Sequence, residues 1–353
     1  MRQVHDYFAD LTARDEYSGV VRITQGRAER FAEAYGFANR AWEIPNTLDT
    51  RFDTASITKL FTSAAALQLV DAGRLALDTP IHDILDLRDT AIDPRVTVFH
   101  LLTHTSGIGD DCEEEDGERY EDLWIDRPNY SVRQTADFLP QFVNKPANFA
   151  PGEKARYCNC SFVLLGLAIE KLTGHTFRDV VTDRVFKPAG MADSGFFATD
   201  EVHPRLAEGA DPIRSDDGSI LGWKRGIYSF PPIGSPDSGA YVTAADLERF
   251  LISIHDATLL SRELSDAFLT PQVDDCEMDG WTRKYAFGLW FYIDAGGEIV
   301  CYEKEGVNAG VSGLIRHFPQ QDVTIVLLST MEDGVWKPAW WLHKRIVSGE
   351  LDL

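Results

Sequence analysis

Apolar positions recur with the period of a helix in some parts of the chain and with the period of a strand in others. Val4, Phe8 and Leu11 have helical spacing, which predicts a helix over residues 1–15. The pattern that follows predicts two antiparallel strands and then a long apolar helix, over residues 17–24, 30–38 and 58–72. Gly73 stands where a helix commonly ends in left-handed backbone.

The middle of the chain keeps the helical period. From about residue 79 to 187 it predicts helices joined by long polar connections. One helix is expected over residues 161–172, and a second over 176–186 that stops before a proline. Thr243 and the Asp three positions later predict a capped helix that reaches His255.

Near residue 286 the period changes to two. Successive antiparallel strands are predicted there over residues 286–293, 298–303, 313–318 and 323–329. The segment Ala295-Gly296-Gly297 and residues 319–322 supply turns, and a last helix is expected to begin near Pro338.

Strands at both ends of the chain with helices between them predict an α+β fold, a mixed α/β arrangement. The antiparallel sheet is formed by the N- and C-terminal segments and flanked by helices, with an inserted all-helical region. We expect residues 1–78 and 240–353 to form the α/β body. Residues 79–239 are expected to be mainly helical and to carry the loops of a functional site.

The charge composition indicates which kinds of binding partner are not expected. The chain of 353 residues has 34 Lys and Arg against 56 Asp and Glu, a net charge of 34 − 56 = −22. Such a charge repels nucleic acid and anionic membranes, so neither is expected as a partner. The longest apolar run, residues 323–328, is too short to cross a bilayer. The first residues lack the apolar stretch of a secretion signal, which favours a cytoplasmic location.

The five cysteines are too sparse for a disulfide framework and lack the spacing of a zinc site. We therefore expect neither a metal nor another cofactor. The sequence leaves the oligomeric state open.

Ser56 and Lys59 are the first candidate catalytic residues. They lie one turn apart on one face of the predicted helix, with Ser56 at its positive end. Burial would favour a neutral lysine able to take the serine proton. Ser-x-x-Lys is a short motif, and taken alone it also fits an ordinary surface helix.

Two further segments carry polar groups of the same kind. Tyr157 and Asn159 lie on the loop before the helix predicted over residues 161–172. There the phenol and the amide could act on a substrate, or they could be a core tyrosine and a turn asparagine. Lys304, Glu305 and Gly306 follow the predicted strand 298–303. There a lysine could set the potential of a site and a glycine could admit a ligand, or the segment could be a solvated strand edge.

The order Ser-x-x-Lys, Tyr-x-Asn, Lys-x-Gly resembles the group of class C β-lactamases, DD-peptidases and family VIII esterases, within the serine β-lactamase and penicillin-binding-protein superfamily. Four longer segments resemble stretches of the same group, namely VFHLLTHTSG, PGEKARYCNCSFVLLGLAIEKLTG, VFKPAGM and SGAYVTAADL. The resemblance covers roughly residues 15 to 330. It implies a serine hydrolase without a cofactor.

The resemblance also implies a role for each motif residue. Ser56 would form the acyl-enzyme, and Lys59 would accept its proton or hold Tyr157 in its basic form. Tyr157 would relay the proton to the leaving group and later activate water, and Asn159 would orient Lys59 and the substrate. The resemblance does not decide whether Lys59 or Tyr157 is the general base.

The third motif would complete the electrostatics of the site. Lys304 would lower the pKa of Tyr157 and attract anionic groups. The N–H groups of Ser56 and Val307 would form the oxyanion hole.

One position departs from the pattern. Glu305 stands where penicillin-recognising members carry Thr, and a carboxylate there would repel anionic substrates if it faces the pocket. An acidic stretch is expected at the mouth of the site as well, formed by Asp110, Asp111, Glu113, Glu114, Glu115 and Asp116.

These charges favour a small neutral or amine-bearing ester or amide as substrate over a β-lactam or a D-alanyl-D-alanine peptide, which remain the alternative within the enzyme class. A non-catalytic binding or scaffolding member of the same fold is the alternative of another class. A metal hydrolase built on His100 and His104 is a third reading, because the pair has the i, i+4 spacing of a zinc face.

Overall fold

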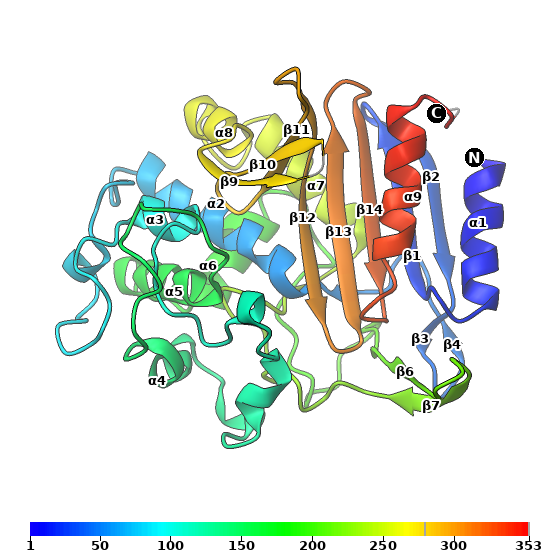
Figure 1. Cartoon of the computed structure of the whole chain (residues 1–353), viewed down its shortest axis with the longest axis horizontal. Helices are drawn as coiled ribbons and strands as arrows, with labels where there is room; N and C mark the ends of the chain where they lie inside the picture. The colour runs from blue at the N-terminus through cyan, green and yellow to red at the C-terminus, as the bar shows by residue number, and fades with distance from the viewer. Residues whose placement is uncertain (279, 352–353) are drawn as a thin grey trace.

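Segments from both ends of the chain meet in one antiparallel sheet (Figure 1). The computed structural model describes residues 1–278 and 280–351. The strands of this sheet are β1 (Gly19–Gln25), β2 (Ala28–Tyr35), β9 (Val273–Met278), β10 (Trp281–Tyr285), β11 (Trp290–Ile293), β12 (Ile299–Asn308), β13 (Val311–Phe318) and β14 (Val323–Ser329). Their order across the sheet is β2-β1-β14-β13-β12-β11-β10-β9. The chain therefore has the predicted mixed α/β fold, in which N- and C-terminal strands pair and a helical region is inserted.

Helices cover both faces of the sheet (Figure 1). They are α1 (Arg2–Ala13), α2 (Thr58–Asp71), α3 (Val98–Leu102), α4 (Leu139–Phe142), α5 (Asn159–Thr173), α6 (Phe177–Val181), α7 (Ala244–His255), α8 (Arg262–Phe268) and α9 (Trp336–Val347). Shorter elements of two to five residues include β3 (Phe37–Asn39), β4 (Ile44–Pro45), β5 (Phe52–Asp53), β6 (Asp211–Arg214), β7 (Ile220–Lys224), β8 (Tyr241–Val242) and the single-turn helix η1 (Ala55–Ile57). Helices α1 and α9 lie on one face, and the helical region that contains α2 and α5 lies on the other.

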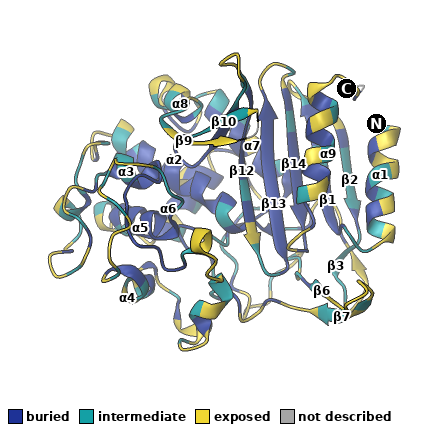
Figure 2. Ribbon diagram, in the orientation of Figure 1, coloured by how far each residue is buried: buried dark blue, intermediate teal, exposed yellow. Residues whose placement is uncertain are grey.

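The strands separate two cores because successive side chains point to opposite faces. Val21 and Leu327 belong to the core under α1 and α9. Their neighbours Val20 and Leu328 belong to the larger core that continues through α2 and α5. Figure 2 shows the central strands and both of these helices as buried. The helical region thus packs against one face of the sheet.

Helix α2 is buried around its circumference. Every residue from Thr58 to Leu67 is buried, and apart from Lys59 these side chains are apolar, small or hydroxyl-bearing. A helix of this composition gains its stability from packing on all sides. It ends as expected, with Gly73 at φ +64°. The single ionisable side chain of this buried stretch is therefore held in a fixed place.

At the site, two element boundaries differ from the sequence prediction. The second helix of the site begins at Asn159, two residues earlier than expected, so Asn159 lies in the first turn of α5 and not on a loop. Strand β12 extends to Asn308, so Lys304, Glu305 and Gly306 lie inside a strand and not at its end. Both elements are longer than their apolar pattern because pairing and packing continue through polar residues.

The strands β9 and β10 were not predicted. Most side chains of β9 are exposed and polar, so they lack the alternation that marks a strand. Residues 286–289, which the pattern placed in a strand, form a turn in which Ala286 N–H donates to the carbonyl oxygen of Leu289.

Within residues 1–278 and 280–351, none of the helices has both the length and the apolar character needed to cross a bilayer.

Candidate active site

The backbone before Ser56 is strained. Strand β5 ends at Asp53, and Ala55 then has φ +42°, a conformation that costs a non-glycine residue about 1–3 kcal/mol. The buried carboxyl group of Asp53 accepts the N–H of Ala55 at 2.7 Å and thereby holds the turn. Burial raises the pKa of Asp53 to about 6. The turn presents Ser56 in η1, directly before α2.

Lys59 is completely buried, and its ammonium nitrogen has three oxygen neighbours. Nζ lies 3.1 Å from Ser56 Oγ, 2.8 Å from Asn159 Oδ1 and 2.8 Å from the carbonyl oxygen of Asp237. Burial lowers the pKa of Lys59, while nearby carboxylates, first that of Asp237, act to raise it. The amine is therefore easier to deprotonate than a solvated lysine.

The three neighbours have different abilities to exchange protons. An amide oxygen and a peptide carbonyl can only accept hydrogen bonds, so Asn159 and Asp237 take two N–H donors of Lys59. A neutral amine has only these two N–H groups, and its lone pair is then directed at the hydroxyl of Ser56. This arrangement can take the proton of Ser56 when its oxygen attacks a carbonyl carbon.

Tyr157 contacts the same hydroxyl from another side. Its Oη donates to Ser56 Oγ at 2.8 Å, and the ring stacks on that of His104 with centroids 4.7 Å apart. Burial raises the pKa of Tyr157 well above its ordinary value. The expected lowering of this pKa by Lys304 is therefore not found, and the resting phenol is protonated.

Lys304 lies under the ring of Tyr157. Its Nζ is 4.8 Å from the ring centroid of Tyr157 and 4.5 Å from that of Trp290. The side chain is fully buried, and among the described residues its Nζ has no hydrogen-bond partner. Burial first, and the charge of Lys59 second, lower the pKa of Lys304 well below its ordinary value. The two lysines thus approach Tyr157 from different elements.

The side chain of Glu305 does not lie on the same face of β12 as that of Lys304. Strand alternation directs its side chain to the face opposite Lys304, which it shares with Glu303 and Arg316. Glu305 still borders the cavity at Ser56, and burial raises its pKa to about 7. A carboxyl group that is about half protonated near neutral pH repels anions weakly, so this residue alone does not decide the substrate charge.

Gly306 allows β12 to touch the turn that carries Ser56. A Cβ atom at this position would lie 2.2 Å from the carbonyl oxygen of Thr54 and 2.8 Å from the amide nitrogen of Ser56. Only glycine permits this approach without a shift of backbone. It brings strand β12 against the backbone of Ser56, an approach that an oxyanion hole made from the N–H groups of Ser56 and Val307 would require.

Apart from the fully buried Lys59 and Lys304, the motif residues border one cavity of about 300 Å³. Its lining includes Ser56, Tyr157, Asn159, Glu305, Gly306 and Val307, together with residues that the sequence did not single out as lining it: Tyr120, Asp237, Ser238, Arg283, Tyr285, Trp290 and Asn308. Of the acidic stretch, Glu114 and Glu115 reach the cavity, whereas Asp110 and Asp111 are buried beneath it.

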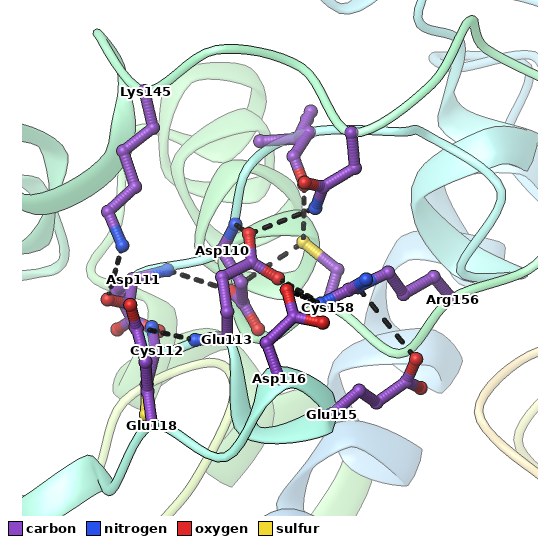
Figure 3. A network of polar contacts seen from close by, with 12 residues as sticks. Asp110, Asp111, Cys112, Glu113, Glu115, Asp116, Glu118, Lys145, Arg156 and Cys158 are labelled. Atoms are coloured by element: carbon purple, nitrogen blue, oxygen red, sulfur yellow. Dashed lines mark hydrogen bonds and ion pairs between the residues drawn. The ribbon is translucent and has the colours of Figure 1, made fainter.

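Arg156 fixes the acidic stretch in this position. Its Nη2 lies 2.8 Å from carboxylate oxygens of both Glu113 and Asp116, and its Nε lies 3.8 Å from Glu115 (Figure 3). Arg156 directly precedes Tyr157, so the same short segment positions the phenol and one acidic wall of the cavity.

Most of the atoms that could bind a metal already take part in hydrogen bonds. His100 Nδ1 accepts the N–H of Thr97, and His104 Nδ1 accepts the N–H of Cys158, so these histidines have separate roles in the backbone. Ligand atoms of Asp110, Asp111 and Cys160 lie within 4.8 Å of one another, but Cys160 Sγ accepts the N–H of Asp111 and the carboxylate of Asp110 accepts three backbone N–H groups. We therefore assign no metal to them.

Comparison with known proteins agrees with this geometry. Residues 4–345 match the family model described as Beta-lactamase. Penicillin-binding protein 4 of Amycolatopsis lactamdurans is 28% identical over 319 residues, which cover 84% of this chain and 76% of that protein. Esterase EstB of Burkholderia gladioli is 32% identical over 273 residues, which cover 70% of this chain and 69% of that protein.

A solved structure of a penicillin binding protein from Bacillus halodurans superposes with a TM-score of 0.87 at 39% identity. The superposition covers 95% of this chain and 99% of that one. Together these matches confirm the resemblance carried by the three motifs, and the chain belongs to the β-lactamase family of serine hydrolases.

Proposed function

We propose that the protein hydrolyses small carboxylic esters or amides through an acyl-enzyme formed on Ser56. The observation that carries the proposal is the contact of a buried Lys59 with Ser56 Oγ, at 3.1 Å, while two acceptor-only groups occupy its other positions. A family member retained only for binding would need none of this arrangement.

The proposed reaction has two stages. Ser56 Oγ attacks the substrate carbonyl carbon while Lys59 takes its proton, and the N–H groups of Ser56 and Val307 stabilise the oxyanion. Tyr157 donates its phenolic proton to the leaving group, which departs as an alcohol or amine. Lys59, as the ammonium, returns a proton to Tyr157, and the same groups then activate the water that releases the acid.

The charge of the cavity favours neutral or amine-bearing substrates. Glu114, Glu115 and Asp237 line it, and Arg283 is the cation at its rim. A carboxylate on the substrate would meet these groups in a partly desolvated site, where like-charge repulsion is strong. The esterase among the relatives is consistent with this preference. A β-lactamase or D-alanyl-D-alanine peptidase, whose substrates carry a carboxylate, is the second candidate because of the penicillin-binding relatives.

The test is the intact mass of the protein after brief exposure to p-nitrophenyl butyrate and, separately, to a penicillin, with Ser56→Ala as the control. We expect ester turnover or a butyryl adduct that is absent in Ser56→Ala, and weak reaction with penicillin. A stable penicillin adduct would keep Ser56 as nucleophile and overturn the substrate preference. The absence of both adducts and of turnover would favour the non-catalytic alternative.

A further inference from the structure

The first turn of α5 has no capping side chain of its own. Cys158 occupies the N-cap position and makes no side-chain capping bond. The first N–H groups of a helix have no acceptor within the helix and need one from elsewhere. In α5 these groups belong to the segment that carries Asn159, so whatever accepts them also fixes the proposed site.

Asp110 supplies the missing acceptors from a distant loop. Its Oδ2 accepts the N–H of Asn159 at 2.8 Å, and its Oδ1 accepts the N–H of Cys160 at 2.9 Å. The thiol of Cys158 also lies 3.6 Å from Oδ1. Asp110 is 2% exposed, and Figure 3 shows it beside Cys158 within the network of the acidic stretch. Both carboxylate oxygens are thus directed at the start of α5.

The contacts continue from this cap to the nucleophile. Asn159, held by Asp110 through its backbone, accepts from Lys59 Nζ through its side chain at 2.8 Å. Lys59 in turn contacts Ser56 Oγ. We propose that Asp110 is a positioning residue of the hydrolase, which fixes Asn159 and supplies the negative charge that faces Lys59 from behind the site. This inference rests on the proposed function.

The adjacent Asp111 provides a matched comparison. It is equally buried, but its Oδ1 accepts the N–H of Cys112, and its Oδ2 has no partner among the described residues. Burial, followed by the charge of Asp110, raises the pKa of Asp111 well above its ordinary value. Burial raises the pKa of Asp110 too, but the N–H groups of Asn159 and Cys160 act to lower it, and Asp111 lacks these donors. Within the pair the negative charge therefore belongs on Asp110 and the proton on Asp111.

Removing the charge of Asp110 should change the titration of Lys59. The charged groups that face Lys59 are the carboxylates of Asp237, Asp110 and Glu114 and the ammonium of Lys304; the carboxyl group of Asp111 and the imidazole of His104 are nearby and neutral. A carboxylate stabilises the ammonium form, so its loss lowers the pKa of Lys59 and extends activity to lower pH. A cap with a purely structural role would leave this limb of the pH profile unchanged.

The experiment compares Asp110→Asn with Asp111→Asn, using p-nitrophenyl butyrate. For Asp110→Asn we expect kcat to fall by about 10- to 100-fold, as misplacement of catalytic groups produces, with a smaller change in KM. The acid limb of its kcat profile should move to lower pH. Asp111→Asn, which exchanges one neutral group for another of the same shape, should leave both unchanged. Asp110→Ser, a smaller helix cap, replaces Asp110→Asn if the latter does not fold, as judged by thermal melting.

A double variant tests the route through Asn159. If Asp110 acts through Asn159, Asp110→Asn should cost little further kcat in an Asn159→Ala background. Fully additive losses, an unmoved acid limb, or equal effects of the substitutions at 110 and 111 would each overturn the inference. Wild-type turnover that Ser56→Ala abolishes must be present first, and its absence would refute the proposed function and not the role of Asp110.

Discussion

At the scale of single residues, the surroundings of each group decide its chemistry. Lys59 is buried against two acceptor-only oxygens, which leaves Ser56 as the partner with which it can exchange a proton. Tyr157 is also buried, but its pKa is raised, so at neutral pH it is a proton donor. The structure therefore favours Lys59 as the base of the first step, a division that the motifs alone left open.

The pH dependence of kcat/KM tests whether Lys59 is the base and Tyr157 the proton donor. The lowered pKa of Lys59 means that activity rises as pH rises through that value, at a pH below the ordinary lysine range near 10.5. In Tyr157→Phe the rate should fall by about 10²-fold or more, because the general acid is lost, while the acid limb persists. Loss of that limb in Tyr157→Phe, measured with p-nitrophenyl butyrate, would assign the base role to Tyr157 instead.

Gly306 is a second residue whose role depends on close contact. Gly306→Ala should lower kcat/KM by about 10²-fold, because a Cβ placed 2.2 Å from the carbonyl oxygen of Thr54 must displace the backbone beside Ser56. Gly222→Ala, at a glycine with open space around it, is the control and should retain wild-type kinetics. Equal activity of the two variants would show that β12 need not touch the turn.

At the scale of elements, β12 serves two cores at once. One face carries Lys304 and Gly306 to the site, and the other carries Glu303 to α9. Glu303 forms an ion pair with Arg316 of β13, and both side chains are buried, with 1% and 2% exposure. Arg316 also donates to the carbonyl oxygen of Ala339 in α9 at 3.3 Å. The pair therefore links the sheet to the helix on its far side.

This ion pair should be costly to break from one side only. Arg316→Met leaves Glu303 buried without its cation, and we expect the free energy of unfolding to fall by about 3–5 kcal/mol. Replacing both partners, as Glu303→Leu with Arg316→Met, should recover most of the loss, because no buried charge remains. Urea denaturation measures both effects. A double variant no more stable than Arg316→Met would contradict the expectation.

At the scale of the whole molecule, the net charge of −22 acts in the same direction as the acidic wall of the cavity. A negative field attracts a cationic substrate over a distance that salt shortens. Under the proposed function, the charge of the surface and the charge of the site would favour the same kind of ligand.

A change of ionic strength distinguishes electrostatic attraction of a cationic substrate from the packing of the substrate in the cavity. Raising NaCl from about 0.05 to 0.5 M should lower kcat/KM for the p-nitrophenyl ester of 4-(trimethylammonio)butyrate, because screening removes the attraction. The neutral p-nitrophenyl butyrate should respond little. The same response of both esters would show that the acidic groups do not take part in recognition.

Much of the fold could be predicted because its signals are local. Alternating apolar residues indicated β1 and the strands from β12 to β14, and Gly73 marked the end of α2. The prediction failed where a strand has little apolar surface, as in β9, and where polar functional residues continue an element, as at Asn159 and Lys304. In those places pairing and packing with distant segments determine the backbone.

The sequence by itself determined the fold class, the family and the identity of the three motifs, because these depend on residue order and local pattern. Tertiary structure alone decided that Lys304 lies under Tyr157, that Glu305 points to the opposite face and that Asp110 caps α5. It also decided the direction of each pKa shift. Burial and contact depend on chain segments that lie far apart in the sequence, such as Tyr157 and Lys304, which are 304 − 157 = 147 positions apart, and only folding brings them within a few ångströms.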